Sequence, residues 1–308
     1  MNAQEKKPQR DAMAARIEKS GFPLITVGTV VLNREWIIGK MLDSLLHQTY
    51  PHDKIFVLIV DGESKDRTLE IIRGILEKAD FSGFEIISKK CSIPEGRNIC
   101  VENMRGQLLF SLDSDVVMDQ TAIKDLFESM IQEKVDIANA DCIQIYVNGI
   151  EEVDAKINEV RASHKSPLRY HTEEVPATGM GHTLVKRRVL NEIRFDPDLT
   201  ICEDLDFSVR AREKGLKILL AKHVLTFDVN IWKKGFSDIH TEIPIEQSLR
   251  GLRKKARASA LTYSFTLTFK DSLEFFWRNK RYPFYLGYIP ALILTVYGTL
   301  AKNFLILL

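Results

Sequence analysis

The sequence predicts an α/β domain built on a mainly parallel β-sheet that is flanked by helices. Apolar runs of strand length alternate with segments in which apolar residues recur at helical spacing. Short polar linkers join them, as in consecutive βαβ units that are wound by right-handed crossovers. Acidic residues stand where several of the apolar runs end, which is where such sheets bind their ligands.

The composition narrows the class of protein. The 308 residues, 45% of them hydrophobic, are enough for one large domain or two modest ones with a core. The formal net charge of +1 gives no electrostatic case for binding nucleic acid. The four cysteines lack Cys-x-x-Cys spacing, so they indicate reduced thiols with neither a disulfide frame nor a zinc site. Residues 1–22 form a polar leader without the apolar core of a signal peptide.

The elements follow in order along the chain. The four strands predicted in the first half are rich in β-branched or bulky apolar residues, and they cover residues 24–32, 54–60, 84–88 and 108–112. Helices are predicted over residues 33–47, 69–76, 94–98 and 121–133, with Asn33 as the N-cap of the first. The second half is less regular, with a strand at 135–147, a helix at 151–164, an exposed loop at 166–176, a helix from Glu203 and strands at 217–220 and 224–228.

Carboxylates mark the ends of two neighbouring strands. Asp61 ends the second strand, and Asp113 and Asp115 follow the fourth. Because parallel strands bring their carboxyl ends to one edge of a sheet, Asp61 and Asp113 are expected at the same edge. Two carboxylates separated by one residue suit a hard divalent cation, although the same pattern also occurs as plain turn chemistry.

A second group of polar residues lies between residues 177 and 228. It contains Ala-Thr-Gly-Met-Gly-His182 and Glu203-Asp-Leu-Asp206, and Asp228 at the end of another apolar run. On a helix, Asp206 and Arg210 lie one turn apart and can pair, while Asp204 faces elsewhere. Taken alone, Glu203 and Asp204 are also consistent with simple complementation of the helix dipole.

The C-terminal part of the chain predicts a membrane anchor. Residues 284–300 are almost wholly apolar, and with the tail at 304–308 they reach the roughly 20 residues of a membrane-spanning helix. The basic cluster at 278–281 places the preceding domain on the cytoplasmic side. Basic and apolar residues alternate before it, which favours helices lying on the membrane surface. The alternative is a solvated basic helix followed by a buried C-terminal helix.

Together the motifs of residues 24–257 resemble an inverting family 2 glycosyltransferase of the GT-A fold. The resemblance implies that Asp204, in the Glu-Asp-x-Asp motif, is the catalytic base. It implies that a Mn²⁺ or Mg²⁺ ion on the donor diphosphate is held by Asp115, with Asp228 where the family often has histidine. The residues implied to bind the nucleotide-sugar donor are Thr29, Val31, Asn33, Glu35, Asp61, Arg97, Asn98, Asp113, Gln247 and Arg250.

The resemblance also implies a domain order and a reaction. The domains are the leader at 1–22, a GT-A catalytic domain at 23–240, amphipathic interface helices at 241–282 and a transmembrane helix at 283–308. The expected reaction transfers a hexose to a hydroxyl of a lipid-linked acceptor, with GDP-mannose favoured as donor over UDP-glucose. Gly251 stands where cellulose-synthase-like members have a tryptophan, so the transfer is expected to be non-processive.

Other functions fit the same residues less well. An EF-hand is excluded because Val117, Met118 and Lys124 occupy positions at which it needs an oxygen ligand, Gly and Glu. A nucleotidyltransferase would carry a glycine-rich phosphate loop, which residues 33–36 do not provide. A polyprenyl-phosphate glycosyltransferase and a catalytically inactive scaffold remain alternatives, and the sequence leaves open whether the chain forms a homo-oligomer.

Overall fold

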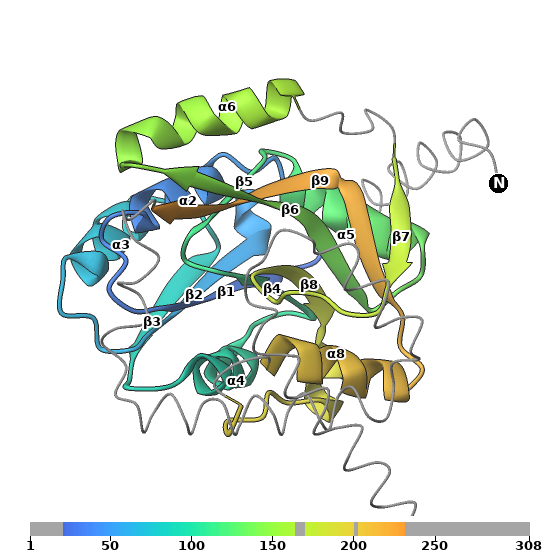
Figure 1. The fold of residues 1–308 in the computed structure, drawn as a ribbon. Helices are drawn as coiled ribbons and strands as arrows, with labels where there is room; N and C mark the ends of the chain where they lie inside the picture. The colour runs from blue at the N-terminus through green and yellow to red at the C-terminus, as the bar shows by residue number, and fades with distance from the viewer. Residues whose placement is uncertain (1–20, 164–169, 200–202, 232–308) are drawn as a thin grey trace, which may run out of the picture.

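A computed structural model of the protein describes residues 21–163, 170–199 and 203–231. These residues form a nine-stranded sheet in the order β3-β2-β1-β4-β8-β6-β9-β5, with β7 added alongside β9. Helices cover both faces of the sheet (Figure 1). The α/β class predicted from the sequence is therefore confirmed.

The first half of the sheet is parallel, as predicted. β1 (Ile25–Val31) lies between β2 (Ile55–Asp61) and β4 (Leu108–Leu112), and β3 (Gly83–Ser88) pairs with the outer side of β2. The last pair of the β1–β2 ladder is Val31 with Asp61, and Asp113 directly follows β4. The two acids therefore lie at the same edge of the sheet, as expected.

The second half of the sheet is mixed, which corrects the prediction of a mainly parallel sheet. β8 (His182–Lys186) runs antiparallel to β4 and to β6 (Ile137–Val147). β9 (Ile218–Ile231) is parallel to β6 but antiparallel to both β5 (Val116–Met118) and β7 (Thr172–Val175). The direction of these strands could not be predicted, because a buried apolar run has the same sequence pattern in a parallel and an antiparallel strand.

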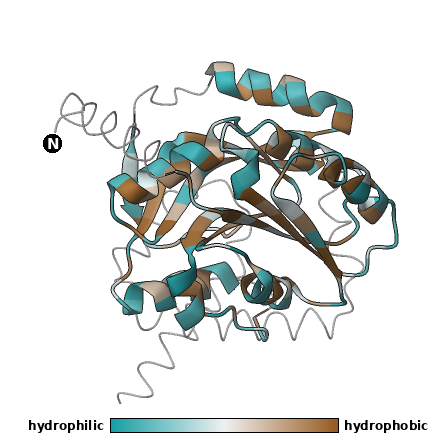
Figure 2. Cartoon of the chain, turned by 180° about the vertical axis from the view of Figure 1, so that it is seen from behind, coloured by the Kyte–Doolittle hydropathy of each residue, from teal (hydrophilic) through white to brown (hydrophobic). Residues whose placement is uncertain are grey.

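Alternating side chains of the strands divide the interior into separate cores. The core on one face lies under α2 (Ile38–Leu46), α3 (Thr68–Leu76) and α5 (Ala122–Gln132). The core on the other face lies under α4 (Ile93–Asn103), α7 (Arg187–Glu192) and α8 (Glu203–Glu213). A third cluster joins α6 (Val153–Ser163) to the far ends of β6 and β9. Figure 2 shows hydrophobic residues concentrated on the strands and on the sheet-facing sides of the helices.

Several local predictions were wrong. Asn33 does not cap α2, because its φ of 51° places it in a left-handed turn and the helix starts five residues later. α4 starts at Ile93, where Ser92 and Glu95 form a capping box, and it runs to Asn103, beyond the predicted end at residue 98. The two strands predicted at 217–228 are one continuous strand, β9. The 3₁₀ turns η1 (His52–Lys54) and η2 (Ile150–Glu152), and the elements β5, β7, β8 and α7, were not predicted.

Within residues 21–163, 170–199 and 203–231, no helix has the length and apolar character that a membrane span requires. The predicted interface helices at 241–282 and the predicted span at 283–308 lie outside the described residues, as do Gln247 and Arg250. All but the last two residues of the predicted leader also lie outside them.

Candidate active site

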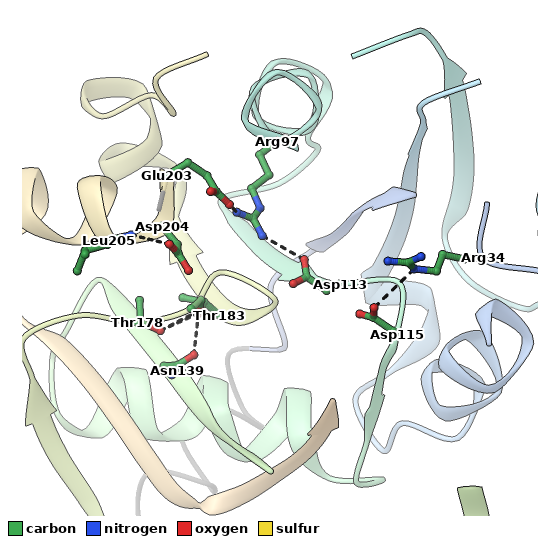
Figure 3. A network of polar contacts seen from close by, with 11 residues as sticks. Arg34, Arg97, Asp113, Asp115, Asn139, Thr178, Thr183, Glu203, Asp204 and Leu205 are labelled. Atoms are coloured by element: carbon green, nitrogen blue, oxygen red, sulfur yellow. Dashed lines mark hydrogen bonds and ion pairs between the residues drawn. The ribbon is translucent and has the colours of Figure 1, made fainter. Parts of the chain in front are cut away.

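Most of the predicted site residues within the described part of the chain lie near the carboxyl ends of β1, β2 and β4. Figure 3 shows the carboxylates of Asp113 and Asp115 between two guanidinium groups, those of Arg97 and Arg34. Asp204 lies on the other side of Arg97. Segments that are far apart in the sequence thus supply alternating charges to one edge of the sheet.

The loops after β1 and β2 are tied together by two side chains that were predicted to bind the donor. The Asn33 backbone N–H donates to Ser64 Oγ at 2.9 Å, and Asn33 Oδ1 accepts from the Lys65 N–H at 2.8 Å. The Glu35 carboxylate accepts from the Arg67 N–H at 2.9 Å. Asn33 and Glu35 therefore brace two loops, and their contact with a nucleotide stays a prediction.

Asp61 organises the turn after β2. Its side chain is completely buried, and its carboxylate accepts hydrogen bonds from the backbone N–H groups of Glu63, at 3.1 Å, and Ser64, at 3.2 Å. Ser88 Oγ at the end of β3 donates a third bond at 2.9 Å. Three donors thus make four hydrogen bonds to this carboxylate, which holds the turn, and the contact of Asp61 with a nucleotide base stays a prediction.

Thr29 and Val31 lie in the interior. The Thr29 side chain is completely buried, and its hydroxyl has no hydrogen-bond partner within the described residues. Val31 is 1% exposed, and its carbonyl accepts from the Gly62 N–H at 2.8 Å. Both side chains therefore contribute to packing, and the contact with the donor predicted for Thr29 and Val31 stays a prediction.

Arg97 stands at the centre of the site. A Cβ on the preceding Gly96 would lie 2.7 Å from Val30, so the glycine lets α4 lie directly on β1. Arg97 Nη2 donates to Asp113 Oδ1 at 3.2 Å, and Nη1 donates to the Glu203 carboxylate. Burial opposes the charge, but the surrounding carboxylates, Asp113 first, raise the pKa of the Arg97 guanidinium above its ordinary value.

Asn98 holds the loop that follows α7. Its amide nitrogen donates to the Phe195 carbonyl at 2.8 Å, and its amide oxygen accepts from the Phe195 N–H at 2.9 Å. The Phe195 ring stacks on Phe207 at 5.0 Å and lies 5.7 Å from the Arg97 guanidinium carbon. The observed role of Asn98 is to position this loop, and the nucleotide contact predicted for it is untested.

Asp113, Asp115 and Asp228 form an acidic cluster. Asp228 reaches it because β5 and β9 pair antiparallel, with Val116 opposite Asp228. Burial, followed by the charges of Asp113 and Asp228, raises the pKa of Asp115 to about 6. The pKa of Asp228 is also raised, first by burial and then by Asp113. The chain thus places negative charges close enough to disfavour one another's ionisation.

The carboxylates of this cluster suit a metal ion that is bound together with a substrate phosphate. No three His, Cys, Asp or Glu side chains in the described part of the chain are arranged to enclose an ion by themselves. Ions such as Mg²⁺ are commonly held by one or two carboxylates together with substrate phosphates and water. Asp115, in the turn before β5, and Asp228, on β9, supply that number of carboxylates, and a cation would relieve their mutual repulsion.

Asp204 lies in the first turn of α8. Its Oδ1 accepts from the Leu205 N–H at 2.7 Å, and burial raises the pKa of its carboxyl group. Its other oxygen lies 3.9 Å from where a Cβ on Gly179 would stand, so the Gly179 loop passes beside it. The predicted pair of Asp206 with Arg210 is confirmed, with 2.9 Å between Arg210 Nε and Asp206 Oδ2.

The sequence did not reveal a buried polar network behind Asp204. Ser208 Oγ donates to the Asp204 carbonyl at 2.8 Å and accepts from the Thr178 N–H at 3.1 Å. Thr183 Oγ1 lies 3.2 Å from Thr178 Oγ1 and donates to Asn139 Oδ1 at 2.7 Å (Figure 3). The network fixes the start of α8 against β6 and β8. The motif Ala-Thr-Gly-Met-Gly-His182 was its only sequence signal.

Two further residues of the site had no predicted role. Glu203 is the buried partner of Arg97, 106 positions away in the chain, and its side chain is 10% exposed. His182 begins β8 beside Gly181, and burial lowers its pKa to about 4. His182 is therefore neutral at physiological pH.

Comparisons with known proteins show the family and the fold of the chain. The family model described as "Glycosyl transferase family 2" matches residues 26–194, which is more than half of the chain. The chain is 22% identical over 210 residues to a Methanococcus voltae protein named dolichyl N-acetyl-alpha-D-glucosaminyl phosphate 3-beta-D-2,3-diacetamido-2,3-dideoxy-beta-D-glucuronosyltransferase, covering 66% of this chain and 65% of that protein. It is 30% identical to Glycosyltransferase AglE of Haloferax volcanii over 42% of this chain and 43% of that protein. The chain thus spans less than two thirds of each of these curated relatives.

Solved structures share the fold. Staphylococcus aureus TarS in complex with UDP-GlcNAc superposes with a TM-score of 0.56 at 18% identity, covering 76% of this chain and 66% of the other. GalNAc-T7 with UDP, GalNAc and Mn²⁺ superposes with a TM-score of 0.57 at 16% identity, covering 78% and 48%. The fold is the GT-A-like α/β fold of glycosyltransferases, with a curled mixed sheet. With its family match extending from β1 through α7, the chain belongs to glycosyl transferase family 2.

Proposed function

We propose that the protein is an inverting glycosyltransferase that moves a sugar from a nucleotide-sugar donor to a hydroxyl of a lipid-linked acceptor. The observation that carries the proposal is the placement of Asp204. Its carboxylate is largely buried and lies across Arg97 from the acidic cluster (Figure 3). A base in that position is separated from the residues proposed to hold the diphosphate, as displacement from the opposite face of the sugar requires.

The residues divide the chemistry between them. Asp204 takes the proton of the acceptor hydroxyl, and its raised pKa makes it a better base than an exposed aspartate. Asp115 and Asp228 would hold Mn²⁺ or Mg²⁺, which supplies positive charge to the departing diphosphate. Arg97 keeps Asp113 and Glu203 in place between these two centres. Asp61 would accept a hydrogen bond from the nucleotide base.

The proposed donor changes when the relatives are considered. The sequence alone favoured GDP-mannose over UDP-glucose, but none of the relatives described above is named for mannose or glucose. The Methanococcus voltae relative is named for a diacetamido-glucuronic acid, and the TarS structure contains UDP-GlcNAc. We therefore propose a UDP-linked sugar carrying an N-acetyl group, with GDP-mannose and UDP-glucose as comparison donors.

The acceptor and location are proposed on separate grounds. The name of the Methanococcus voltae relative includes a dolichyl phosphate sugar, which supports a lipid-linked acceptor. Residues 283–308 are proposed to anchor the chain, with the catalytic domain on the cytoplasmic side. The full chain should therefore stay in the membrane pellet after carbonate extraction, and its release would contradict the anchor without affecting the proposed chemistry.

A ligand panel tests the donor. The melting temperature of the full chain in mild detergent would be measured with UDP, GDP and CDP, each with Mn²⁺ and with EDTA. A ligand present at 100 times its Kd stabilises the folded state by about 2.7 kcal/mol, so the preferred base should stand out. UDP with Mn²⁺ should give the largest shift, and a larger shift with GDP would restore GDP-mannose as the favoured donor.

Transfer assays then separate the remaining alternatives. Single-turnover reactions would offer UDP-GlcNAc with either a polyprenyl phosphate or a polyprenyl-linked monosaccharide. Product from the lipid-linked sugar alone supports the proposal, whereas product from the lipid phosphate alone favours a polyprenyl-phosphate glycosyltransferase. Nucleotide binding without any transfer or hydrolysis of the bound donor would favour an inactive scaffold.

A further inference from the structure

The side chain of Arg34 reaches the acidic cluster from the loop after β1. Its Nε lies 3.6 Å from Asp115 Oδ2, which is within ion-pair range but too far for a hydrogen bond. Within the described residues this buried Nε has no hydrogen-bond partner. Arg34 therefore neutralises Asp115 by charge alone and leaves a donor unused.

The backbone of Arg34 is held independently of this contact. Its N–H donates to Thr68 Oγ1 at 2.7 Å, and its carbonyl accepts from the N–H groups of Ile37 and Ile38 at 3.0 and 2.9 Å. The side chain is 41% exposed, so part of it faces solvent, where a ligand can reach it. The backbone of Arg34 is thus fixed by hydrogen bonds that do not depend on its side chain.

The positive charge of Arg34 competes with the proposed metal for Asp115. The Arg34 Nε lies 3.6 Å from an Asp115 oxygen, so the guanidinium charge already offsets part of the repulsion within the acidic cluster that a cation would relieve. A divalent cation on Asp115 would stand beside this positive charge and be repelled by it. A nucleoside diphosphate removes the conflict, because its oxygens offer Arg34 the hydrogen-bond acceptors that it lacks.

We propose that Arg34 is the resting counter-ion of Asp115 and exchanges that carboxylate for the donor diphosphate when metal and nucleotide bind. Asp115 becomes available to the cation only as Arg34 turns to the phosphates. The site therefore favours the metal–nucleotide complex over free metal. This inference rests on the proposed function, in particular on Asp115 as a metal residue.

The experiment measures metal binding with and without nucleotide. Mn²⁺ binding to the full chain in detergent would be followed by electron paramagnetic resonance, which reports free Mn²⁺, first alone and then with saturating UDP. Arg34→Met should bind Mn²⁺ alone about 10-fold more tightly than the wild type, because the repelling charge is gone. The same variant should bind Mn²⁺ with UDP about 10-fold more weakly, because a charge-assisted phosphate contact is lost.

Matched variants identify the cause. Arg34→Lys keeps the charge and should resemble the wild type with Mn²⁺ alone. Arg67→Met removes a charge from the neighbouring loop, where Arg67 pairs with Glu70 at 2.9 Å, and should change neither affinity. A melting temperature for each variant, measured without ligands, confirms that the fold is intact.

The outcomes are distinguishable. If Arg34→Met binds Mn²⁺ alone no more tightly than the wild type does, the counter-ion role is overturned. The same holds if neither protein binds Mn²⁺ alone measurably. Unchanged affinity of Arg34→Met for Mn²⁺ with UDP overturns the exchange. Asp115→Asn that keeps wild-type affinity for Mn²⁺ with UDP instead refutes the metal assignment on which the inference rests.

Discussion

Replacing Arg97 by methionine should destabilise the protein strongly, and the structure gives the size of the effect. Arg97 and Glu203 are 8% and 10% exposed, so removing the arginine leaves a buried carboxylate without a counter-charge. Breaking a buried pair in this way costs about 3–5 kcal/mol. Asp113, the second partner, is 44% exposed and can be solvated, so it should add little.

Urea unfolding at pH 8 measures this loss as a lower midpoint at an unchanged m-value. The double variant Arg97→Met/Glu203→Met should recover most of the lost stability, because an apolar pair can replace a buried ion pair. Arg210→Met is the control. Its pair with Asp206 is more exposed, so its loss should cost no more than about 1 kcal/mol.

The pH dependence provides a second test with a definite sign. Burial already raises the pKa of Glu203, and removing the Arg97 charge must raise it further. A carboxyl group whose pKa is higher in the folded state gains stability as the pH falls, because the folded chain takes up the proton first. The difference in free energy of unfolding between the wild type and Arg97→Met should therefore become smaller as the pH falls from 8 to 5. A difference below about 1 kcal/mol at pH 8, or one that grows as the pH falls, would refute the reasoning.

Other substitutions probe the rest of the site. Asp204→Asn should slow single-turnover transfer by about 10²-fold or more and leave nucleotide binding intact, whereas Asp206→Asn should lower stability more than transfer. Transfer by Asp204→Asn at the wild-type rate would place the base elsewhere. Gly181→Ala should weaken nucleotide binding, measured by calorimetry, because its Cβ would stand 2.2 Å from an Asp113 oxygen. Gly74→Ala lies within α3, where the new Cβ would meet nothing within 4 Å, and it should instead raise stability in urea by about 0.5–1 kcal/mol.

The parts of the fold that followed from the sequence are those set by local pattern. β1 to β4 could be read from their apolar runs, and the pairing of Asp206 with Arg210 follows from helical spacing alone. Asn33 was assigned wrongly because the same residue type favours both an N-cap and a left-handed turn. The tight approach of loops that decided between them is not a local property.

The remaining features depend on distant partners. β5 has three residues, too few for a periodic pattern, and its existence depends on pairing with β9. The bond between Arg97 and Glu203 joins α4 to α8, and nothing in either segment specifies the other. Without the family resemblance, the sequence would have suggested acids at a sheet edge but not the alternation of acids and arginines that the structure displays.

β9 has a consequence for how the protein is made. It pairs with β5, β6 and β7, so it closes the second half of the sheet, yet it is the last described element to leave the ribosome. Asp115 and Asp228 are 113 positions apart and meet only through the β5–β9 ladder. Such long-range pairing is slow to form because the intervening chain must first be ordered. A nascent chain that has completed β1 to β4 therefore already contains the loops of the donor edge, but it lacks the second carboxylate of the proposed metal site. This site is completed only after synthesis has passed β9.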